Sequence, residues 1–310
     1  MEKIGLTLDD YIIEEKLGSG SYGRVYRAKR KSDPLGKTIA LKVITIRSSY
    51  RNKKLIEMTK SEVDKLKKLS LPECNLFVIC YYDSYYDEKN NNFLIEMELI
   101  EGQDMDKYVK KLRNEKSEEM VYFYLLLIAK DVLQGLKYTH SKNIIHNDIK
   151  MTNIRIDTNN VPRIIDYGLA CNMAPYRDFC KNDNGTPLYI SPETIEDNIR
   201  YPSSDLWALG VTLYFAVTKK YPFIIPKKAG LRQFFEIVIN NEPAKLDTSN
   251  EQLNVLVNKL LVKDYTNRLT VDQGLEMLNV INDPRSKPAP ENPSLMSNDK
   301  NPSPEYTIQG

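Results

Sequence analysis

The sequence predicts an α+β fold in two lobes: a small antiparallel β-sheet lobe with one helix, and a larger, mainly α-helical lobe. Residues 9–46 are rich in β-branched residues and punctuated by glycines, which is typical of strands. Apolar residues recur at helical spacing over 53–69, and 77–100 returns to an alternating hairpin pattern with a polar turn. These stretches predict a five-stranded sheet and the helix that accompanies it.

Beyond the second hairpin the pattern becomes helical. Residues 118–140 form a long apolar stretch, and 203–220 and 251–263 also have the length and spacing of helices. From about residue 281 the chain is dominated by Pro, Ser and Asn, with too few apolar groups to offset the entropy lost on folding. We therefore expect a folded domain over 9–280 and a disordered tail over 281–310.

Composition limits the possible partners. The 310 residues are 41% hydrophobic, enough for a substantial core, and 44 basic against 42 acidic residues leave a net charge of only +2. This balance gives no indication of a nucleic-acid partner. The longest uncharged apolar run, 121–129, is about half a membrane span, and the N-terminus lacks a signal-peptide pattern. We expect an intracellular protein, cytoplasmic or nuclear, that contacts neither nucleic acid nor membrane.

The chain has four cysteines and two histidines: Cys74, Cys80, Cys171, Cys180, His140 and His146. The cysteines do not follow C-x-x-C spacing, and no histidine lies near them in the sequence. A zinc site needs several such ligands at short spacing. We therefore expect neither a zinc site nor a disulfide framework.

A glycine-rich stretch, LGSGSYGRV, occupies residues 17–25 between two strand-like runs. Its glycines let backbone N–H groups approach phosphate oxygens closely and permit a sharp turn. This spacing alone is weak support for nucleotide binding. In a dinucleotide-binding fold a helix would follow at once, whereas RVYRAKR continues as a strand, so a hairpin over a nucleotide is the better interpretation. The candidate contacts are Leu17, Gly18, Gly20 and Gly23.

Lys42 lies within the apolar strand IALKVI. A lone lysine there is more often a device that keeps an edge strand soluble. A lysine that grips phosphates must be kept oriented by a carboxylate, and Glu62 is the acid that shares its helical face with Val63 and Leu66. Together, Lys42 and Glu62 favour a phosphate-binding pair.

Five motifs then follow in order: HNDIKMTN at 146–153, IIDYGLA at 164–170, GTPLYISPE at 185–193, DLWALG at 205–210 and KDYTNRLT at 263–270. In order and spacing they resemble the conserved motifs of eukaryotic-type protein kinases of the Ser/Thr class, and the glycine-rich hairpin fits the same family. The resemblance implies a two-lobed kinase fold. Its N-lobe would span about 9–97, its hinge 98–102 and its C-lobe 103–280.

The resemblance also implies chemical roles. Asp148 would accept the proton of a Ser or Thr hydroxyl in a protein substrate, and Lys150 would neutralise charge on the transferring γ-phosphoryl group of ATP. Asn153 and Asp166 present hard oxygen ligands and would hold Mg²⁺. Lys42 would grip the α and β phosphates. Reading these carboxylates as ordinary loop residues does not explain their spacing.

The adenine and ribose contacts are implied in the same way. Met97 would control the rear of the adenine pocket, while the backbones of Glu98 and Ile100 would hydrogen-bond the ring. The remaining contacts would come from Val25 and Ala40 above the ring, Arg155 below it, and Asp104, which could hold the ribose or a basic residue of the substrate.

Other matched positions imply structural roles. Glu193 and Arg268 would form a buried ion pair, and Asp205 would hold the backbone of the catalytic loop. An internal hydrophobic column would contain His146, Tyr167, Leu66 and Tyr81. His140 is expected only to pack.

Two residues depart from the family pattern. Asn147 replaces the arginine that binds the phosphate in kinases activated by loop phosphorylation, and between Cys171 and Asn184 the only phosphorylatable residue is Tyr176. We therefore predict activity without phosphorylation of this segment. Arg155 replaces a leucine at the floor of the adenine pocket, where its stem could cover the ring or its guanidinium could stack on it.

The motifs also bear on substrate choice. Thr186 in GTPLY is typical of Ser/Thr kinases and would hydrogen-bond near Asp148, while Thr152 stands where arginine-directed members often have a glutamate. A strong preference for basic residues is therefore not indicated, and PLYI suggests an apolar pocket for the residue after the acceptor. Two alternatives remain: a pseudokinase scaffold, motivated by Asn147 and Arg155, and a small-molecule kinase, disfavoured because GTPLYISPE is intact.

Overall fold

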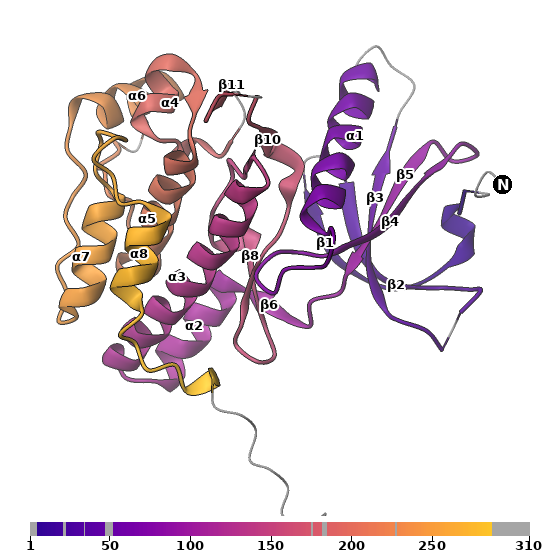
Figure 1. Ribbon diagram of the computed structural model, residues 1–310, viewed down its shortest axis with the longest axis horizontal. Coiled ribbons are helices and arrows are strands. Elements are labelled where there is room, and N and C mark those ends of the chain that lie inside the picture. The colour runs from indigo at the N-terminus through magenta and orange to yellow at the C-terminus, as the bar shows by residue number, and fades with distance from the viewer. Residues whose placement is uncertain are drawn as a thin grey trace, which may run out of the picture.

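The computed structural model describes residues 5–20, 23–33, 35–46, 52–174, 176–181, 185–226 and 228–286. Figure 1 shows a β-sheet lobe on the right and a larger helical lobe on the left, as the sequence predicted. The α+β, two-lobed prediction is therefore confirmed. No helix in these ranges has the length and apolarity that crossing a membrane requires.

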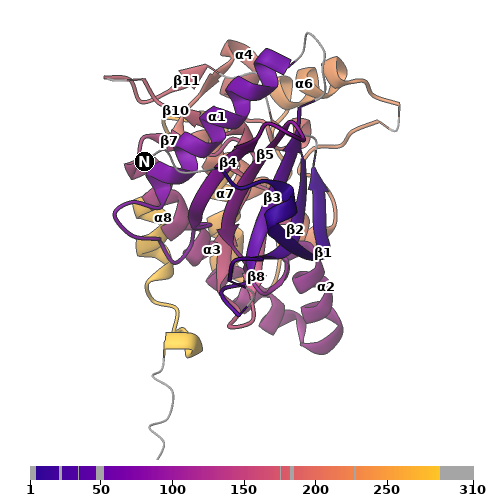
Figure 2. The ribbon, with the colours of Figure 1, turned by 90° about the vertical axis from the view of Figure 1, so that its right-hand side faces the viewer.

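The N-lobe contains a five-stranded antiparallel sheet in the order β1-β2-β3-β5-β4, which Figure 2 views face on. Its strands are β1 (Tyr11–Gly20), β2 (Gly23–Arg30), β3 (Ile39–Thr45), β4 (Tyr81–Asp87) and β5 (Asn92–Glu98). Helix α1 (Asn52–Leu69) packs its apolar face, including Val63 and Leu66, into the main hydrophobic core. A second small core on the sheet contains Tyr11, Leu41 and Leu94. Both the strand number and the single helix agree with the prediction.

The C-lobe is built around helices α2 (Met105–Glu115), α3 (Glu118–Ser141), α4 (Pro192–Asp197), α5 (Pro202–Thr218), α6 (Leu231–Asn240), α7 (Glu251–Leu260) and α8 (Val271–Leu278). Helix α5 is apolar on nearly all sides and is buried along most of its length, with Trp207 and Leu209 almost inaccessible to solvent. A helix that is hydrophobic all round belongs inside a lobe. The predicted helices over 118–140, 203–220 and 251–263 correspond to α3, α5 and α7.

Three small sheets position the loops between the lobes. They comprise β6 (Gly102–Asp104), β8 (Ile154–Asp157) and β9 (Pro162–Ile164); β7 (Ile144–Ile145) with β10 (Cys171–Asn172); and β11 (Cys180–Lys181) with β12 (Ile199–Arg200). The 3-10 helices are η1 (Leu8–Asp10), η2 (Met151–Asn153), η3 (Tyr167–Leu169), η4 (Pro187–Tyr189) and η5 (Pro284–Ser286). The loop over residues 146–153 and the segment after Asp166 are thus anchored at several points by strand pairing.

The cysteines correct one expectation. Cys74 is paired with Cys80, and Cys171 with Cys180, as disulfides with Cα–Cα distances of 5.4 and 6.4 Å. Both distances lie in the range that a disulfide requires. The expectation of no disulfide framework was wrong because it rested on spacing along the chain. Strands β10 and β11, each paired to another strand, bring Cys171 and Cys180 together in space.

Ordered contacts continue past the end of α8. Arg285 forms an ion pair with Asp131 of α3 at 2.7 Å and donates to the carbonyl of Asn160 at 2.8 Å. These contacts tie the chain after α8 to α3 and to the turn between β8 and β9. Of the tail expected over 281–310, residues 287–310 lie outside the described residues.

The ion pair expected between Glu193 and Arg268 is present and buried. Arg268 donates from Nη1 to Glu193 Oε1 at 2.8 Å and from Nη2 to Oε2 at 2.9 Å, and the Arg268 side chain is 0% exposed. Burial opposes ionisation of Glu193, but the hydrogen bonds and charge of Arg268 outweigh it and lower the Glu193 pKa. The pair joins the start of α4 to the loop before α8.

We expect Arg268→Met to lower the free energy of unfolding by about 3–5 kcal/mol, because it leaves the buried charge of Glu193 without a partner. Urea unfolding checks this. Arg232→Met is the matched control: Arg232 pairs with Glu236 on the surface, with side chains 93% and 56% exposed, and its loss should cost no more than about 0.5 kcal/mol. Equal effects of the two substitutions would contradict the buried role.

Candidate active site

The loop between β7 and η2 gathers the residues expected to transfer the phosphoryl group. Asp148 Oδ2 accepts from Lys150 Nζ and from Asn153 Nδ2, both at 2.7 Å. Asp148 Oδ1 accepts from the hydroxyl of Thr186 at 2.6 Å, and Lys150 also donates to that hydroxyl at 2.8 Å. A buried carboxylate is therefore held in one orientation by three donors, and a lysine lies beside it.

Asp205, at the start of α5, holds the backbone of this loop. Its carboxylate accepts from the N–H groups of His146 at 2.9 Å and Asn147 at 2.8 Å. Its Oδ2 also lies 2.9 Å from Nε2 of His140. Burial opposes ionisation of Asp205, but the hydrogen bond and charge of His140, followed by His146, outweigh it and lower the pKa. The sequence predicted the role of Asp205 but not its partner His140.

Asn147 takes a left-handed backbone conformation with φ +68°. Asparagine adopts this region more readily than most residues do. Its side-chain Nδ2 donates to the carbonyl of Leu169 at 3.1 Å and lies 3.0 Å from Sγ of Cys171. Asn147 therefore links the catalytic loop directly to the segment that follows Asp166, without an intervening anion.

Lys42 of β3 and Glu62 of α1 meet as the sequence predicted. Lys42 Nζ donates to Glu62 Oε1 at 2.5 Å and to Asp166 Oδ1 at 3.4 Å. Burial lowers the Lys42 pKa, but the negative charges of Glu62 and Asp166 raise it by a larger amount, so that the net shift is upward. The lysine is held as a cation between the two lobes.

Asp166 and Asn153 provide a donor set that fits Mg²⁺. Asp166, at φ +63°, has a half-exposed carboxylate whose pKa is raised by burial but lowered more by Lys42 and His146. Asn153 Nδ2 is used twice by Asp148, so its amide oxygen is the atom left for a ligand. Ile165 N–H donates to Asn153 O at 3.0 Å, which brings the two segments together. One carboxylate and one amide oxygen are the hard ligands that Mg²⁺ prefers.

The glycine-rich hairpin connects β1 and β2, with residues 21 and 22 outside the described ranges. Gly20 pairs with Gly23, and Gly18 with Val25. A Cβ on Gly23 would lie 2.7 Å from the carbonyl oxygen of Val43, so only glycine allows this close approach to β3. Leu17 lies in β1, one residue before Gly18.

Strand pairing brings together the residues predicted to contact adenine from the N-lobe. Val25 pairs with Lys42, and Ala40 pairs with Met97, so these positions of β2, β3 and β5 are adjacent. Glu98 ends β5, and its carboxylate accepts from Arg163 of β9 at 3.1 Å. This ion pair between the hinge and β9 was not predicted.

Arg155 of β8 lies along the hinge. Its Nε donates to Ile100 O at 2.7 Å and its Nη2 to Gly102 O at 2.9 Å. Its Nη1 forms an ion pair with Asp104 at 3.1 Å. The antiparallel pairing of Asp104 with Arg155 explains why the guanidinium meets this carboxylate. The guanidinium is therefore engaged by the hinge and Asp104.

Of the four residues predicted for the internal column, His146, Tyr167 and Leu66 are buried, whereas Tyr81 is only partly buried and packs against the same core. The rings of His146 and Tyr167 pack edge to face, with centroids 4.7 Å apart. His146 Nδ1 accepts from Asp148 N–H at 3.2 Å, and Nε2 lies 3.0 Å from Ile165 O. The Tyr167 hydroxyl shares a hydrogen bond of 2.9 Å with Thr139 of α3, a partner that the sequence did not indicate.

The segment after Asp166 is described except for residues 175 and 182–184. Tyr176 is fully exposed at φ +64°. Strand β10 pairs with β7 and β11 pairs with β12, while Thr186 lies against Asp148 and Lys150. Both arms of the segment are thus attached to the C-lobe.

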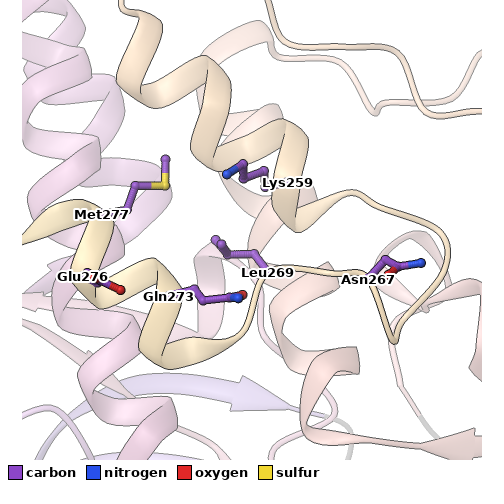
Figure 3. Close-up of a pocket in the computed structure, with 6 residues that line it drawn as sticks. All are labelled: Lys259, Asn267, Leu269, Gln273, Glu276 and Met277. Carbon is purple, nitrogen blue, oxygen red and sulfur yellow. The ribbon is translucent and has the colours of Figure 1, made fainter.

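A separate pocket lies between α7 and α8 (Figure 3). It is lined by Lys259, Asn267, Leu269, Gln273, Glu276 and Met277. None of these residues was a predicted site residue, and Lys259 and Glu276 give it mixed charge. It is not the site that the sequence pointed to.

We expect Asp205→Asn to destabilise the protein at pH 7 by about 2 kcal/mol or more, because hydrogen bonds to a charged acceptor are lost. The folded pKa of Asp205 is lowered, so its contribution is complete above the unfolded pKa and is lost as pH falls through the folded pKa. The difference in unfolding temperature between the two proteins should therefore narrow from about pH 5 downward. A difference independent of pH would contradict this.

The sequence is similar to those of known protein kinases. The Protein kinase domain family matches residues 11–278. Serine/threonine-protein kinase TIO of Arabidopsis thaliana is 31% identical over 266 residues, covering 85% of this chain and 18% of its own length. Serine/threonine-protein kinase Nek2 of Homo sapiens is 30% identical over 275 residues (86% and 59%), and Death-associated protein kinase 2 of Mus musculus is 28% identical over 274 (86% and 70%).

The chain thus spans less than a fifth of TIO and over half of Nek2. The shared region is the one that contains the hairpin, the hinge and the catalytic loop described above. Members of this family generally use ATP with Mg²⁺ and act on proteins. The chain belongs to the protein kinase domain family, of the eukaryotic Ser/Thr type.

Proposed function

We propose that this chain transfers the γ-phosphoryl group of MgATP to Ser or Thr hydroxyls of protein substrates. The observation that carries the proposal is the network in which Asp148 is held by Lys150, Asn153 and Thr186. A base must have a fixed orientation and reach the proton that it accepts. The Lys42–Glu62 pair, which joins β3 to α1 in the N-lobe, supports the same function.

The residues divide the chemistry between them. Asp148 orients the attacking hydroxyl and accepts its proton, and Lys150 stabilises negative charge on the transferring oxygens. Lys42, kept cationic by Glu62 and Asp166, holds the phosphates. Asn153 and Asp166 would hold Mg²⁺, which would supply positive charge to neutralise that of the phosphates.

The function would not depend on phosphorylation of the segment after Asp166. The direct bond from Asn147 to Leu169 O, and the pairing of β10 with β7, support this proposal because they hold the segment without a phosphate. In family members with an arginine at this position, the phosphate provides that link.

Adenine binding is compatible with Arg155. Because its guanidinium is engaged by Ile100 O, Gly102 O and Asp104, Arg155 forms part of the pocket wall and leaves the N–H of Ile100 for the ring. Under this proposal Leu17, Val25 and Ala40 cover the ring. ATP would then bind in the manner usual for the family, with the polar side chain of Arg155 below the adenine ring.

We expect Asp148→Asn to reduce transfer of labelled γ-phosphate to a generic protein substrate by at least about 100-fold, because the base is lost. Binding of MgATP, followed by thermal shift, should remain. Asp272→Asn is the matched control, since Asp272 is exposed and, among the residues that the structure describes, pairs with Lys137 on the surface of the C-lobe. If the unmodified protein binds MgATP but transfers no phosphate, the scaffold alternative is correct.

We expect the protein, purified without phosphate and checked by intact mass, to be active, and Tyr176→Phe to have the same activity. The physical reason is that the exposed Tyr176 side chain takes no part in holding the segment. Initial rates before and after phosphatase treatment measure this. An inert protein that becomes active only after phosphorylation of the segment would contradict the proposal.

A further inference from the structure

A set of aromatic contacts leads from Asp148 to the C-terminal end of α5. The Thr186 hydroxyl donates to Asp148 at 2.6 Å, and the Thr186 carbonyl accepts from the N–H of Tyr189 at 3.0 Å, so Tyr189 lies close to Asp148. The Tyr189 and Tyr221 rings pack edge to face at 6.0 Å, and Tyr221 lies 4.9 Å from Phe215. The ammonium of Lys219 lies 5.9 Å from the centre of the Phe215 ring. A continuous surface therefore connects the catalytic base to an exposed lysine.

Lys219 and Arg113 place two cations at the end of this surface. Arg113 of α2 donates from Nη2 to the carbonyls of Ala216 and Val217, which satisfies the last turn of α5. Arg113 therefore already balances the partial negative charge at the C-terminal end of α5. Lys219 is not needed for that purpose. Lys219 has φ +59°, a conformation that costs energy for a non-glycine residue.

These two cations have no acidic partner in the described ranges. No ion pair joins Lys219 or Arg113 to a carboxylate there, and Nε of Arg113 is a buried donor without an acceptor. Partial burial and the charge of Arg113 lower the Lys219 pKa, and Asp106 offsets this only in part. An anion at this position would relieve the repulsion between the two cations.

The acidic residues along the hinge are, in contrast, already neutralised by arginines of the chain. Glu98 pairs with Arg163 at 3.1 Å. Glu101 pairs with Arg27 at 2.6 Å, and Asp104 with Arg155 at 3.1 Å. A basic residue of a substrate would have to displace an internal arginine here. These three carboxylates therefore present no unpaired negative charge to a substrate, whereas the exposed Lys219 has no ion-pair partner within the described ranges.

We propose that Lys219 and Arg113 form an anion-binding subsite for the protein substrate, so that the enzyme favours acceptor hydroxyls flanked by an anionic side chain. This inference rests on the proposed function and narrows its substrate class. The aromatic surface of Tyr189, Tyr221 and Phe215 would carry the peptide from Asp148 to the two cations. The anionic group is a carboxylate or a phosphoryl group, which share this chemistry.

The test uses peptides with one Ser acceptor in a neutral background. Glu, phosphoserine, Gln or Lys is placed in turn at each flanking position. The ratio of kcat/KM for each anionic peptide to that for its Lys counterpart is measured with the full chain. Binding of the same peptides is measured by fluorescence anisotropy on the Asp148→Asn protein, which reports the subsite without catalysis.

At one or more positions the Glu peptide should be favoured over the Lys peptide by up to about fivefold, the size expected for a partly exposed ion pair. A larger ratio with phosphoserine than with Glu identifies a phosphoryl group as the preferred anion. Lys219→Gln should remove the preference, and Lys219→Glu should invert it. Lys259→Gln is the matched control, because Lys259 is also an exposed lysine of the C-lobe but lies in the pocket of Figure 3.

The outcomes test the subsite and the proposed function separately. If the chain phosphorylates peptides without a charge preference, or if Lys219→Gln leaves the preference unchanged, the subsite is wrong while the proposed function stands. If no peptide is phosphorylated but anionic peptides bind more tightly and lose this advantage in Lys219→Gln, the subsite stands and the proposed function fails. If Lys259→Gln weakens binding of the Glu peptide as much as Lys219→Gln does, the effect is one of general surface charge. That result would overturn the subsite.

Discussion

The active site depends on one buried carboxylate, that of Asp205. A charge inside a protein is costly unless donors surround it, and Asp205 has the N–H groups of His146 and Asn147 and the ring of His140. Because these N–H groups belong to the residues just before Asp148, satisfying the carboxylate also sets the direction of the catalytic loop. Helix α5 can impose this position because it is itself buried in the C-lobe core.

The segment after Asp166 is held by short-range contacts. Asn147 is too short to reach a distant phosphate, but its amide reaches Leu169 O. Strand pairing at β10 and β11 holds both arms of the segment. Neutral hydrogen bonds of this kind are little affected by salt, whereas an exposed phosphate–arginine link is screened. Asn147 thus attaches the segment to the loop before η2 through one short, neutral contact.

Local motifs made much of this site predictable. The fold, α3, α5 and the Lys42–Glu62 pair follow from periodicity and from residue types at fixed spacing, because one turn of helix or one strand determines which residues share a face. Other contacts join residues from distant segments. Thr139 meets Tyr167, Arg155 meets the hinge carbonyls, and Cys171 meets Cys180 only after the lobes and small strands have packed. Spacing along the chain contains no information on these side-chain directions.

Tyr167 has a consequence for how this enzyme could be inhibited. Its ring is completely buried against His146, and its hydroxyl is bonded to Thr139. Any compound that must expel this ring from the core has to break that hydrogen bond and leave the buried Thr139 hydroxyl without this partner. The extra cost is about 1 kcal/mol relative to a phenylalanine, which is roughly a fivefold loss of affinity. Compounds that leave the ring in place avoid this loss.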